Sequence, residues 1–529
     1  MQDRRTPVED AGATAIASAC ALLWLLHPLQ SEVVDYVTQR TESMMGLAYL
    51  ATMYASIRGI SAQRPVRWYA AAIAACAAGM TCKESMATAP LMVLLYDIAF
   101  CAGSLRSALK RRGGLYAGLA ACWLVLIPLV SSGPRSHSAG LGSGISPLVY
   151  FLNQPPIILR YVRLAVWPVG LVFDYGLTRD VGWLVALPAA VPLVLLAVAT
   201  AIAWRRHPRL AFLGTWFFVT LAPTSSVLPI ATEVGAERRM YLPLAALIVL
   251  ATIGVSRLFK NRRSLLATLA AVGAAFGVLT IQRNAEYRQP QGLWQTVIDR
   301  YPHGRAHYNR GIELKAVGRR AEAVREFEIA AVDLADAEYA LGFELASDGR
   351  HADAVQHLRA YTEARPFDLN VVRAFNLMGQ SLKGLGRHDE ALEAFRQVLR
   401  MQPHNVDALG GVGDSLLALD RLDEAIAAYQ EYVRLAPGNM KAFANLGHTL
   451  GRRGRHEAAM SAYRAAIALE PREAALRVNL AANLASIGRF DEAIEQGRLA
   501  LEFESDPASR NEIAELIAQL ANAKNGTSR

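Results

Sequence analysis

Cysteine is scarce in this 529-residue chain: all five cysteines lie before residue 220, as do seven of the eight tryptophans. No CxxC pair and no Cys/His spacing of the kind that binds zinc occurs, which excludes redox and zinc-site proteins. Cysteine in apolar helices is usually a small packing residue. Charged residues are also few, at 19%, whereas 53% of the residues are hydrophobic. That balance is too apolar for an ordinary soluble enzyme and too charged for a chain buried in lipid throughout, so it predicts two unlike halves.

The first half contains apolar stretches that recur with short polar interruptions. Most approach the roughly 17 to 25 residues that a helix needs to span hydrocarbon. An additional apolar run at 148–168 contains Pro155, Pro156, Arg160 and Arg163, and we interpret it as an interfacial or re-entrant helix with both ends on one side. The other stretches predict nine membrane spans, at 11–26, 44–57, 68–82, 86–102, 115–132, 181–203, 210–230, 240–256 and 264–281.

Basic residues are distributed unequally between the connecting loops. One side receives the Arg/Lys clusters at 58–67, 106–112, 205–209 and 257–263, together with Arg4 and Arg5. By the positive-inside rule that side is cytoplasmic, so the N-terminus is predicted to be cytoplasmic and the second half extracytoplasmic. Arg outnumbers Lys 48 to 7, as GC-rich bacterial coding favours. The predicted location is therefore a bacterial inner membrane, with the second half in the periplasm.

Acidic and basic residues gather on the predicted outer face. Ionisable groups at bilayer depth cost about 2.5 to 3.5 kcal/mol each on insertion scales, so they tend to pair and to mark a polar cavity. Two interpretations stay open: a single converging site, or separate solvated charges and interfacial anchors. The five clusters are His27, Glu32, Asp35, Arg40 and Glu42; Lys83 and Glu84; Arg160 and Arg163; Asp174 and Tyr175; and Glu237, Arg238 and Arg239.

From about residue 304 the sequence repeats itself. Pro403, Pro437 and Pro471 are 34 residues apart, a small residue recurs at the eighth position of each repeat, and alanine recurs at the twentieth. This pattern is typical of the tetratricopeptide repeat, in which two antiparallel helices approach closely over the small residues. The predicted architecture is all-α: a multispan membrane domain over 1–281, a linker over 282–303, an α-solenoid of six repeats over 304–507, and a capping helix and tail over 508–529.

Six stacked repeats form a concave surface that suits an extended peptide or a partner helix. Asn309, Asn445 and Asn479 fall at the sixth position of their repeats. There an amide side chain faces that surface and is able to hydrogen-bond a peptide backbone whatever its sequence. A solvated polar face explains the three asparagines equally well, so peptide binding is one of two open interpretations.

Four motifs occur in a fixed order in the first half: "HPLQSEVVDYVTQRTE", "CKES", "RYVRLAVWPVGLVFDYG" and "AERRMYLP". With the repeats downstream, they resemble the transmembrane and tetratricopeptide-repeat O-mannosyltransferases and their bacterial relatives over nearly the whole chain. Those proteins are GT-C glycosyltransferases, multispan enzymes that take a sugar from a polyprenyl-phosphate carrier on the outer face. The resemblance implies a GT-C-like membrane domain, that lipid carrier as donor substrate, a protein or peptide acceptor bound by the repeats, and no nucleic acid.

The chemistry that the resemblance implies needs two kinds of side chain. Cations at the membrane rim would neutralise the departing phosphate, and a carboxylate would accept the proton of the acceptor hydroxyl. The candidate carboxylates, which act as base or orient the cations, are Glu32, Glu84, Asp174 and Glu237. The candidate phosphate-binding cations are Arg40, Lys83, Arg160, Arg163, Arg238 and Arg239. The supporting residues are His27, Glu42, Tyr175 and Tyr241; no residue is assigned to a metal or to a further cofactor.

The chain departs from the family's pattern in two places. Family members have two further spans before the His-Pro motif, with a catalytic acidic pair between them, and this chain lacks that loop; we therefore expect an N-terminally truncated sequence. Gln30 replaces the second histidine of the usual "HPxHTE" motif, which weakens a metal or base role for His27.

The alternative to an enzyme is a non-catalytic membrane anchor carrying a repeat scaffold that assembles envelope proteins. Convergence of the outer charges on one cavity would favour the enzyme.

Overall fold

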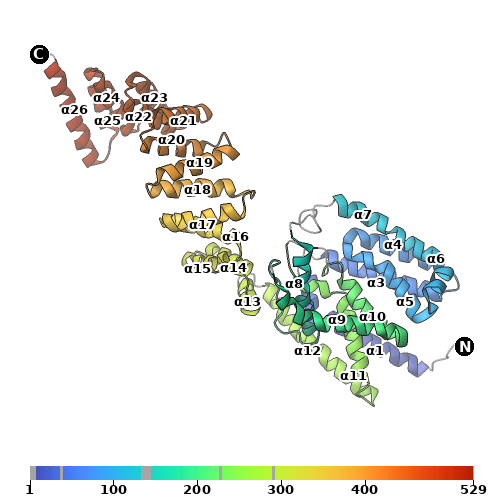
Figure 1. Cartoon of the computed structure of the whole chain (residues 1–529). Helices are drawn as coiled ribbons and strands as arrows, with labels where there is room; N and C mark the ends of the chain where they lie inside the picture. Colours follow the sequence, from blue (N-terminus) through green and yellow to red (C-terminus); the bar gives the residue numbers. More distant parts are fainter. Residues whose placement is uncertain are drawn as a thin grey trace. The chain divides into compact units, whose positions relative to one another are not determined.

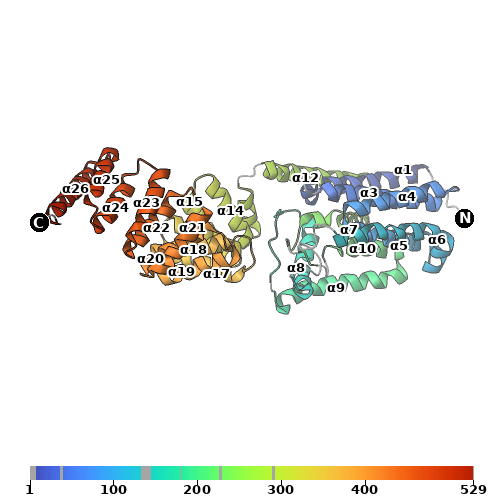
Figure 2. The same ribbon diagram turned by 90° about the horizontal axis from the view of Figure 1, so that it is seen from above.

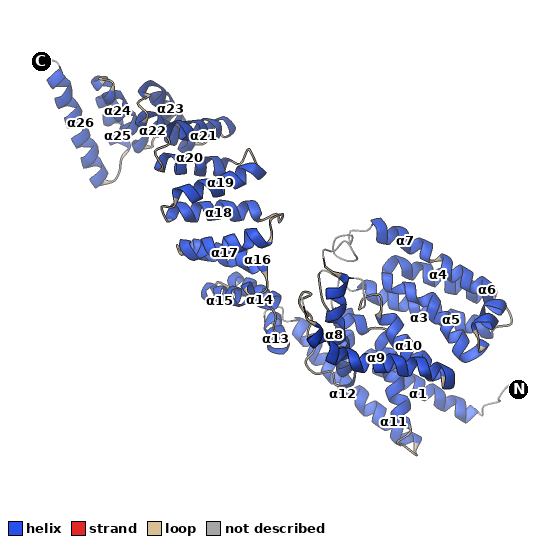
Figure 3. Cartoon of the chain, viewed as in Figure 1, coloured by secondary structure: helices blue, strands red, loops and turns tan. Residues whose placement is uncertain are grey.

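The computed structural model describes residues 7–35, 40–132, 145–179, 181–225, 229–230, 232–288 and 292–527. These ranges fold into helices joined by turns and contain no β-strand (Figure 3). The all-α class predicted from the sequence is therefore confirmed. The chain divides into two compact units, residues 1–318 and 319–529. Arg4 and Arg5, which belong to the predicted cytoplasmic charge, lie outside the described residues.

The first unit contains fourteen labelled α-helices and several short 3-10 or π segments within the described ranges. The short segments are η1 (Pro28–Gln30), η3 (Glu84–Thr88), η4 (Ile98–Ala102) and η5 (Glu237–Met240). The α-helices are α1 (Pro7–Leu26), α2 (Ser31–Asp35), α3 (Arg40–Ser61), α4 (Val66–Cys82), α5 (Ala89–Asp97), α6 (Leu105–Ala121), α7 (Trp123–Ser132), α8 (Pro147–Val166), α9 (Trp183–Arg206), α10 (Pro208–Leu221), α11 (Pro243–Ser256), α12 (Arg262–Arg288), α13 (Leu293–Arg300) and α14 (Gly304–Ala316).

Helices of the first unit pack mainly as antiparallel neighbours. α3 and α4 form a hairpin, α1 lies against α11 and α12, and α10 lies between α9 and α11 (Figures 1 and 2). Large buried side chains join these pairs into one core; for example, the rings of Tyr49 on α3 and Trp216 on α10 meet edge to face with their centroids 5.5 Å apart. The short segments η1 and η5 contact each other and bring two of the sequence motifs together.

Every predicted span lies mostly in helical structure, and the largest differences are in two of them. Stretch 115–132 is divided at Cys122 between α6 and α7, and stretch 210–230 is helical only to Leu221, with residues 226–228 outside the described ranges. Three helical stretches are long and apolar enough to cross a bilayer: Glu84–Ala102, Trp183–Arg206 and Arg262–Arg288. Gly12–Leu26 and Pro28–Val34 form a fourth candidate that is bent by 55°. These helices indicate membrane association; the nine-span topology and the interfacial position of α8 stay predictions.

The segment between the predicted domains differs from a simple linker. α12 continues to Arg288, and α13 occupies Leu293–Arg300, so most of 282–303 is helical. The first unit extends to Gly318, which means that α14, the first helix of the predicted repeats, is grouped with it. Charged side chains near the start of α14 therefore lie within the first compact unit.

A buried ion pair holds the end of α5 against α6. Both carboxylate oxygens of Asp97 accept hydrogen bonds from Arg112 Nη1 at 2.8 Å, and one also accepts from the Tyr116 hydroxyl at 2.5 Å. Asp97 is fully buried and directly precedes the π segment η4. The backbone of Arg112 leaves helical geometry, with φ −136° and ψ 29°. This kink within α6 accompanies the approach of Arg112 to Asp97.

Replacing Arg112 with methionine is expected to lower the free energy of unfolding by about 3 kcal/mol, because Asp97 would remain buried without its cation. The measurement is the thermal denaturation midpoint of the full chain in detergent. Arg111→Met is the matched control, because Arg111 is an exposed neighbour on the same helix. Equal midpoints for the two variants would contradict this account of the pair.

The second unit contains the remaining helices, which stack as successive antiparallel pairs (Figure 1). They are α15 (Arg320–Ala331), α16 (Ala335–Ser347), α17 (His351–Ala364), α18 (Val371–Gly384), α19 (His388–Met401), α20 (Val406–Ala418), α21 (Leu422–Leu435), α22 (Met440–Arg452), α23 (His456–Leu469), α24 (Ala474–Ser486), α25 (Phe490–Phe503) and α26 (Pro507–Thr527).

The small residue at the eighth position allows the two helices of a repeat to meet. A Cβ atom added to Gly379 would lie 2.7 Å from the ring of Phe395, and one added to Gly413 would lie 2.6 Å from the ring of Tyr429. Since a real Cβ cannot approach so closely, glycine is required for the aromatic ring to wedge between the helices. The last helix, α26, packs against α25 and buries Ile513, as a capping helix should.

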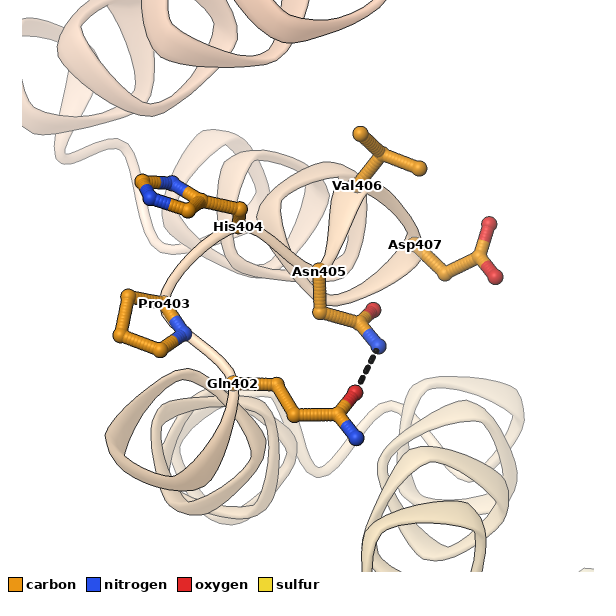
Figure 4. A pocket seen from close by; sticks show the side chains of 6 residues that line it. All are labelled: Gln402, Pro403, His404, Asn405, Val406 and Asp407. Carbon is orange, nitrogen blue, oxygen red and sulfur yellow. Dashed lines mark hydrogen bonds between the residues drawn. The ribbon is translucent and has the colours of Figure 1, made fainter.

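A shallow hollow of about 470 Å³ lies at the turn between α19 and α20. Its polar groups serve the turn itself: Asn405 Oδ1 accepts from the backbone N–H of Ala408 at 3.0 Å and so caps α20, while Asn405 Nδ2 donates to Gln402 Oε1 at 3.0 Å (Figure 4). This arrangement explains the asparagine at the start of α20 as a helix N-cap.

Candidate functional site

The motif "AERRM" places its two arginines in a buried ion-pair network. The backbone N–H of Arg238 donates to Glu32 at 2.9 Å, and its guanidinium pairs with both Glu32 and Glu233. Arg239 is buried beside it and donates to the Tyr150 hydroxyl at 3.1 Å and to the Thr224 carbonyl at 2.8 Å. Burial would raise the pKa of Glu233, but Arg238 and Arg239 together lower it. The network thus joins the His-Pro segment to η5 with its charges paired.

Glu237 is fully buried and is held by the loop that follows α8. One carboxylate oxygen accepts from the backbone N–H of Val172 at 2.6 Å and from the Tyr175 hydroxyl at 3.3 Å. The other oxygen accepts no hydrogen bond from any described residue, and Arg283 Nη2 lies 3.8 Å from it. Burial raises the pKa of Glu237 to about 7, although Arg283 opposes the shift. A carboxyl group with this pKa exchanges its proton near neutral pH.

Arg160 packs against Tyr175, which holds Glu237, and also lines a surface hollow. Its guanidinium lies 5.5 Å from the ring centroid of Tyr175 and 5.0 Å from that of Tyr301, and Nη2 donates to the Gly170 carbonyl at 2.9 Å. Its Nε is buried with no hydrogen-bond partner among the described residues. The hollow measures about 350 Å³ and is lined by Pro156, Ile157, Leu159, Arg160, Arg163, Ala189 and Tyr301. Two guanidinium groups beside apolar side chains suit an anion.

Asp174 is anchored to α14 instead of the hollow. Its Oδ1 accepts from the backbone N–H of Gly176 at 2.6 Å and from Arg305 Nη2 at 2.5 Å, and His303 Nε2 lies 3.6 Å away. Burial lowers the pKa of His303, and Asp174 offsets part of that shift. Arg305 Nη1 also donates to the Thr232 carbonyl at 2.5 Å.

Lys83 and Glu42 form a separate ion pair: Lys83 stands on the turn after α4, and Glu42 stands at the start of α3.

His27 is buried at the bend between α1 and η1, where Nδ1 accepts from the Leu29 N–H at 3.2 Å and Nε2 lies 3.2 Å from the Ala165 carbonyl. These contacts give His27 a capping role. The Tyr241 carbonyl accepts from Trp24 Nε1 at 2.7 Å.

The structure brings some of the predicted residues together and leaves others apart. Glu32, Arg238 and Arg239 share one network; Glu237, Tyr175 and Arg160 share a second; and the charge of Glu32 contributes to the raised pKa of Glu237, which links the two. Lys83 and Glu42 pair with each other. Glu84 is half-buried at the start of η3, while Arg40 and Arg163 are exposed.

The three repeat asparagines lie in different surroundings. Asn309 on α14 donates to the Arg305 carbonyl of its own helix at 3.0 Å, Asn445 on α22 donates to Asp414 at 3.3 Å, and Asn479 on α24 is exposed. Asn309 belongs to the first unit, whereas the other two belong to the second. Their peptide-binding role stays a prediction.

Several charged residues of the site were missed by sequence reasoning. They are Glu233, Arg283, Glu286, Arg300, His303 and Arg305, of which Arg300 and Glu286 pair at 2.6 Å. Glu233 stands four residues before Glu237, and Arg283 follows the last apolar run, so the criterion applied to the other outer charges would have found both. Within the described ranges, no group of three His, Cys, Asp or Glu side chains is placed to hold a metal ion.

Comparison with known proteins finds a repeat family and several curated relatives. The tetratricopeptide repeat family matches residues 376–439 and 445–510. Protein O-mannosyl-transferase Tmtc2 of Drosophila melanogaster is 30% identical over 173 residues, covering 30% of this chain and 18% of that protein. Human Protein O-mannosyl-transferase TMTC4 is 24% identical over 355 residues, covering 58% of this chain and 48% of that protein. The chain thus spans less than half the length of these relatives.

Solved structures of MamA are similar to about a third of the chain. One crystal structure is 22% identical, covers 31% of this chain and 94% of MamA, and has a TM-score of 0.30. MamA 41-end from Desulfovibrio magneticus RS-1 is also 22% identical and has a TM-score of 0.31, covering 32% of this chain and 95% of its own.

The fold and the comparisons together define an all-α, membrane-associated protein with tetratricopeptide repeats. Its curated relatives are protein O-mannosyl-transferases, at low identity. The resemblance inferred from the four motifs and the repeats is therefore confirmed.

Proposed function

We propose that this chain is a membrane glycosyltransferase that moves a sugar from a polyprenyl-phosphate carrier to protein hydroxyl groups on the extracytoplasmic face. The observation that carries the proposal is the hollow beside α8, which Arg160 and Arg163 line together with apolar side chains. A phosphate oxygen is a suitable acceptor for guanidinium groups. The apolar lining of the same hollow suits the first part of a polyprenyl chain.

In the proposed reaction, the bond between the anomeric carbon of the sugar and the carrier phosphate oxygen breaks. The acceptor hydroxyl oxygen forms the new bond to that carbon, its proton passes to a carboxylate, and the phosphate leaves with its added negative charge. Arg160 and Arg163 stabilise that charge where it develops, which lowers the barrier.

The four candidate carboxylates differ in what they are able to do. Glu32 and Glu237 are buried, and Glu32 is paired with Arg238, so both suit the orientation of cations and of the loop after α8. Asp174 and Glu84 keep part of their surface exposed. A base must come within hydrogen-bonding reach of the acceptor hydroxyl, which makes Asp174 and Glu84 the better candidates.

The repeat half is proposed to bind the protein acceptor in the periplasm. Tetratricopeptide repeats present concave surfaces that accommodate peptides, and the relatives' names specify transfer to protein. Asn445 and Asn479, which both belong to the second unit, are the proposed contacts with the acceptor backbone.

The test is transfer of labelled mannose from polyprenyl phosphate to protein. Membranes from cells producing the full chain are incubated with the labelled donor, and the protein fraction is delipidated and counted. We expect label in protein only when the chain is present.

The matched control is the same chain with Arg160→Gln and Arg163→Gln, which should fall to the background of membranes lacking the chain. Absence of protein label with the unaltered chain would refute the transferase and favour a membrane-anchored repeat scaffold. Equal labelling by the control and the unaltered chain would refute the phosphate site while leaving the enzyme class intact.

A further inference from the structure

The loop at 170–176, which follows α8, touches both parts of the proposed site. The backbone N–H of Val172 and the hydroxyl of Tyr175 hold Glu237, while the Gly170 carbonyl accepts from Arg160. The loop is neither helix nor strand. Without a regular backbone ladder, its conformation depends on contacts from elsewhere in the chain.

Three side chains after α12 supply those contacts. Arg300 Nη1 donates to the Leu171 carbonyl at 2.8 Å, and His303 Nε2 lies 3.4 Å from the Asp174 carbonyl. Arg305 makes the most extensive contact, because its two terminal nitrogens reach Asp174 Oδ1, the Gly176 carbonyl at 3.3 Å and the Thr232 carbonyl.

Arg305 also ties the loop to the segment that leads into η5. The Gly176 carbonyl accepts from the backbone N–H of Val234 at 3.0 Å as well as from Arg305. One guanidinium therefore fixes the 170–176 loop and the 232–236 segment at the same point. Glu237, which stands at the end of that segment, is bonded to the same loop at Val172.

The Arg305–Asp174 pair is mostly shielded from solvent, because the two side chains are only 22% and 12% exposed. The planar guanidinium of Arg305 satisfies three acceptors on two segments, so it fixes their relative geometry. Gly176, with φ +78°, leaves room for the His303 ring beside the loop, because a Cβ at this position would lie 3.0 Å from that ring.

We propose that Arg305, on the first helix of the predicted repeats, is a positioning residue that sets the 170–176 loop and thereby the placement of Glu237 and Arg160. The consequence for the rate of sugar transfer rests on the proposed function. The consequence for the loop does not, and it is measured separately.

The first measurement is hydrogen–deuterium exchange of the full chain in detergent, followed in peptides that cover residues 170–178. Arg305→Gln is expected to raise exchange of these amides roughly tenfold, since the loop loses its bridging donor. Arg310→Gln is the matched control, because Arg310 lies on the same helix and pairs with Glu313 instead. Arg305→Lys keeps the charge but loses the fork, so its exchange should be intermediate. Unchanged exchange in Arg305→Gln would overturn the proposal.

The second measurement is the kinetics of label transfer. Arg305→Gln is expected to lower kcat roughly tenfold with the KM for the carrier within twofold, because misplacement of reacting groups slows chemistry more than it weakens binding. A merely structural role would reduce the amount of folded protein without changing kcat per folded molecule. Raised exchange with an unchanged kcat would overturn the positioning role. If the unaltered chain transfers no label, the proposed function fails, and the exchange experiment still decides whether Arg305 holds the loop.

Discussion

Replacing Arg160 with alanine is expected to lower the rate of sugar transfer about 100-fold or more. Removal of one donor aimed at developing negative charge typically costs about 10² to 10³ in kcat. Arg160 is suited to that role because it lines the hollow, because Tyr175 and Tyr301 pack on its guanidinium, and because the Gly170 carbonyl fixes Nη2. The rate of label transfer per folded molecule is the measurement.

Two variants sharpen the Arg160 experiment. Arg160→Lys keeps the charge but loses the planar stacking, so it should recover only part of the rate. Arg106→Ala removes an exposed arginine at the start of α6, on the predicted cytoplasmic side, and should leave the rate unchanged. A rate for Arg160→Ala within twofold of the unaltered chain would contradict the assignment of the hollow to the donor phosphate.

The stability of the first unit is expected to fall as pH rises from about 4.5 to 7, through the titration of Glu237. Burial raises the pKa of this carboxyl to about 7 from an ordinary value of 4.5, so the folded state binds more protons than the unfolded state across that window. Its contribution is therefore fully present below pH 4.5 and is lost as pH approaches 7. At about 1.4 kcal/mol per pKa unit, the change amounts to roughly 3 kcal/mol.

Thermal denaturation of the full chain in detergent at pH 5 and pH 8 tests this expectation. Glu237→Gln keeps an acceptor for the Val172 N–H and removes the titration, so the difference between the two midpoints should shrink. Glu328→Gln, which changes an exposed carboxylate on α15, should keep the difference seen in the unaltered chain. Identical pH dependence in Glu237→Gln and the unaltered chain would refute the raised pKa.

Periodic features of the sequence predicted the fold well. The apolar runs coincide with helices, and the recurring small residues allow the two helices of a repeat to approach closely at Gly379 and Gly413. Helix breaks were harder to predict from the sequence. The kink at Arg112 accompanies a contact with Asp97, fifteen residues away, and no local sequence pattern encodes that contact. The continuation of α12 to Arg288 was hidden because polar residues follow its apolar part.

The candidate site was predictable only in part. The rule that charges at the membrane rim tend to pair brought Glu32, Arg160, Glu237 and Arg238 into consideration, but it did not give their partners. Glu32 and Arg238 are separated by 206 residues, so their contact depends on the packing of η1 against η5. Arg305 belongs to the repeat pattern by sequence, and only the fold brings it to Asp174.

The most direct test of the central claim is equilibrium binding of a fluorescent polyprenyl phosphate to the purified full chain in detergent. The account predicts saturable binding that Arg160→Ala weakens at least about tenfold, as expected for loss of a charge-assisted contact of about 1.5 to 3 kcal/mol. Unlabelled polyprenyl phosphate should compete, and the uncharged polyprenol should not. Equal affinity in Arg160→Ala and the unaltered chain, or equal competition by polyprenol, would contradict a phosphate site in the hollow beside α8.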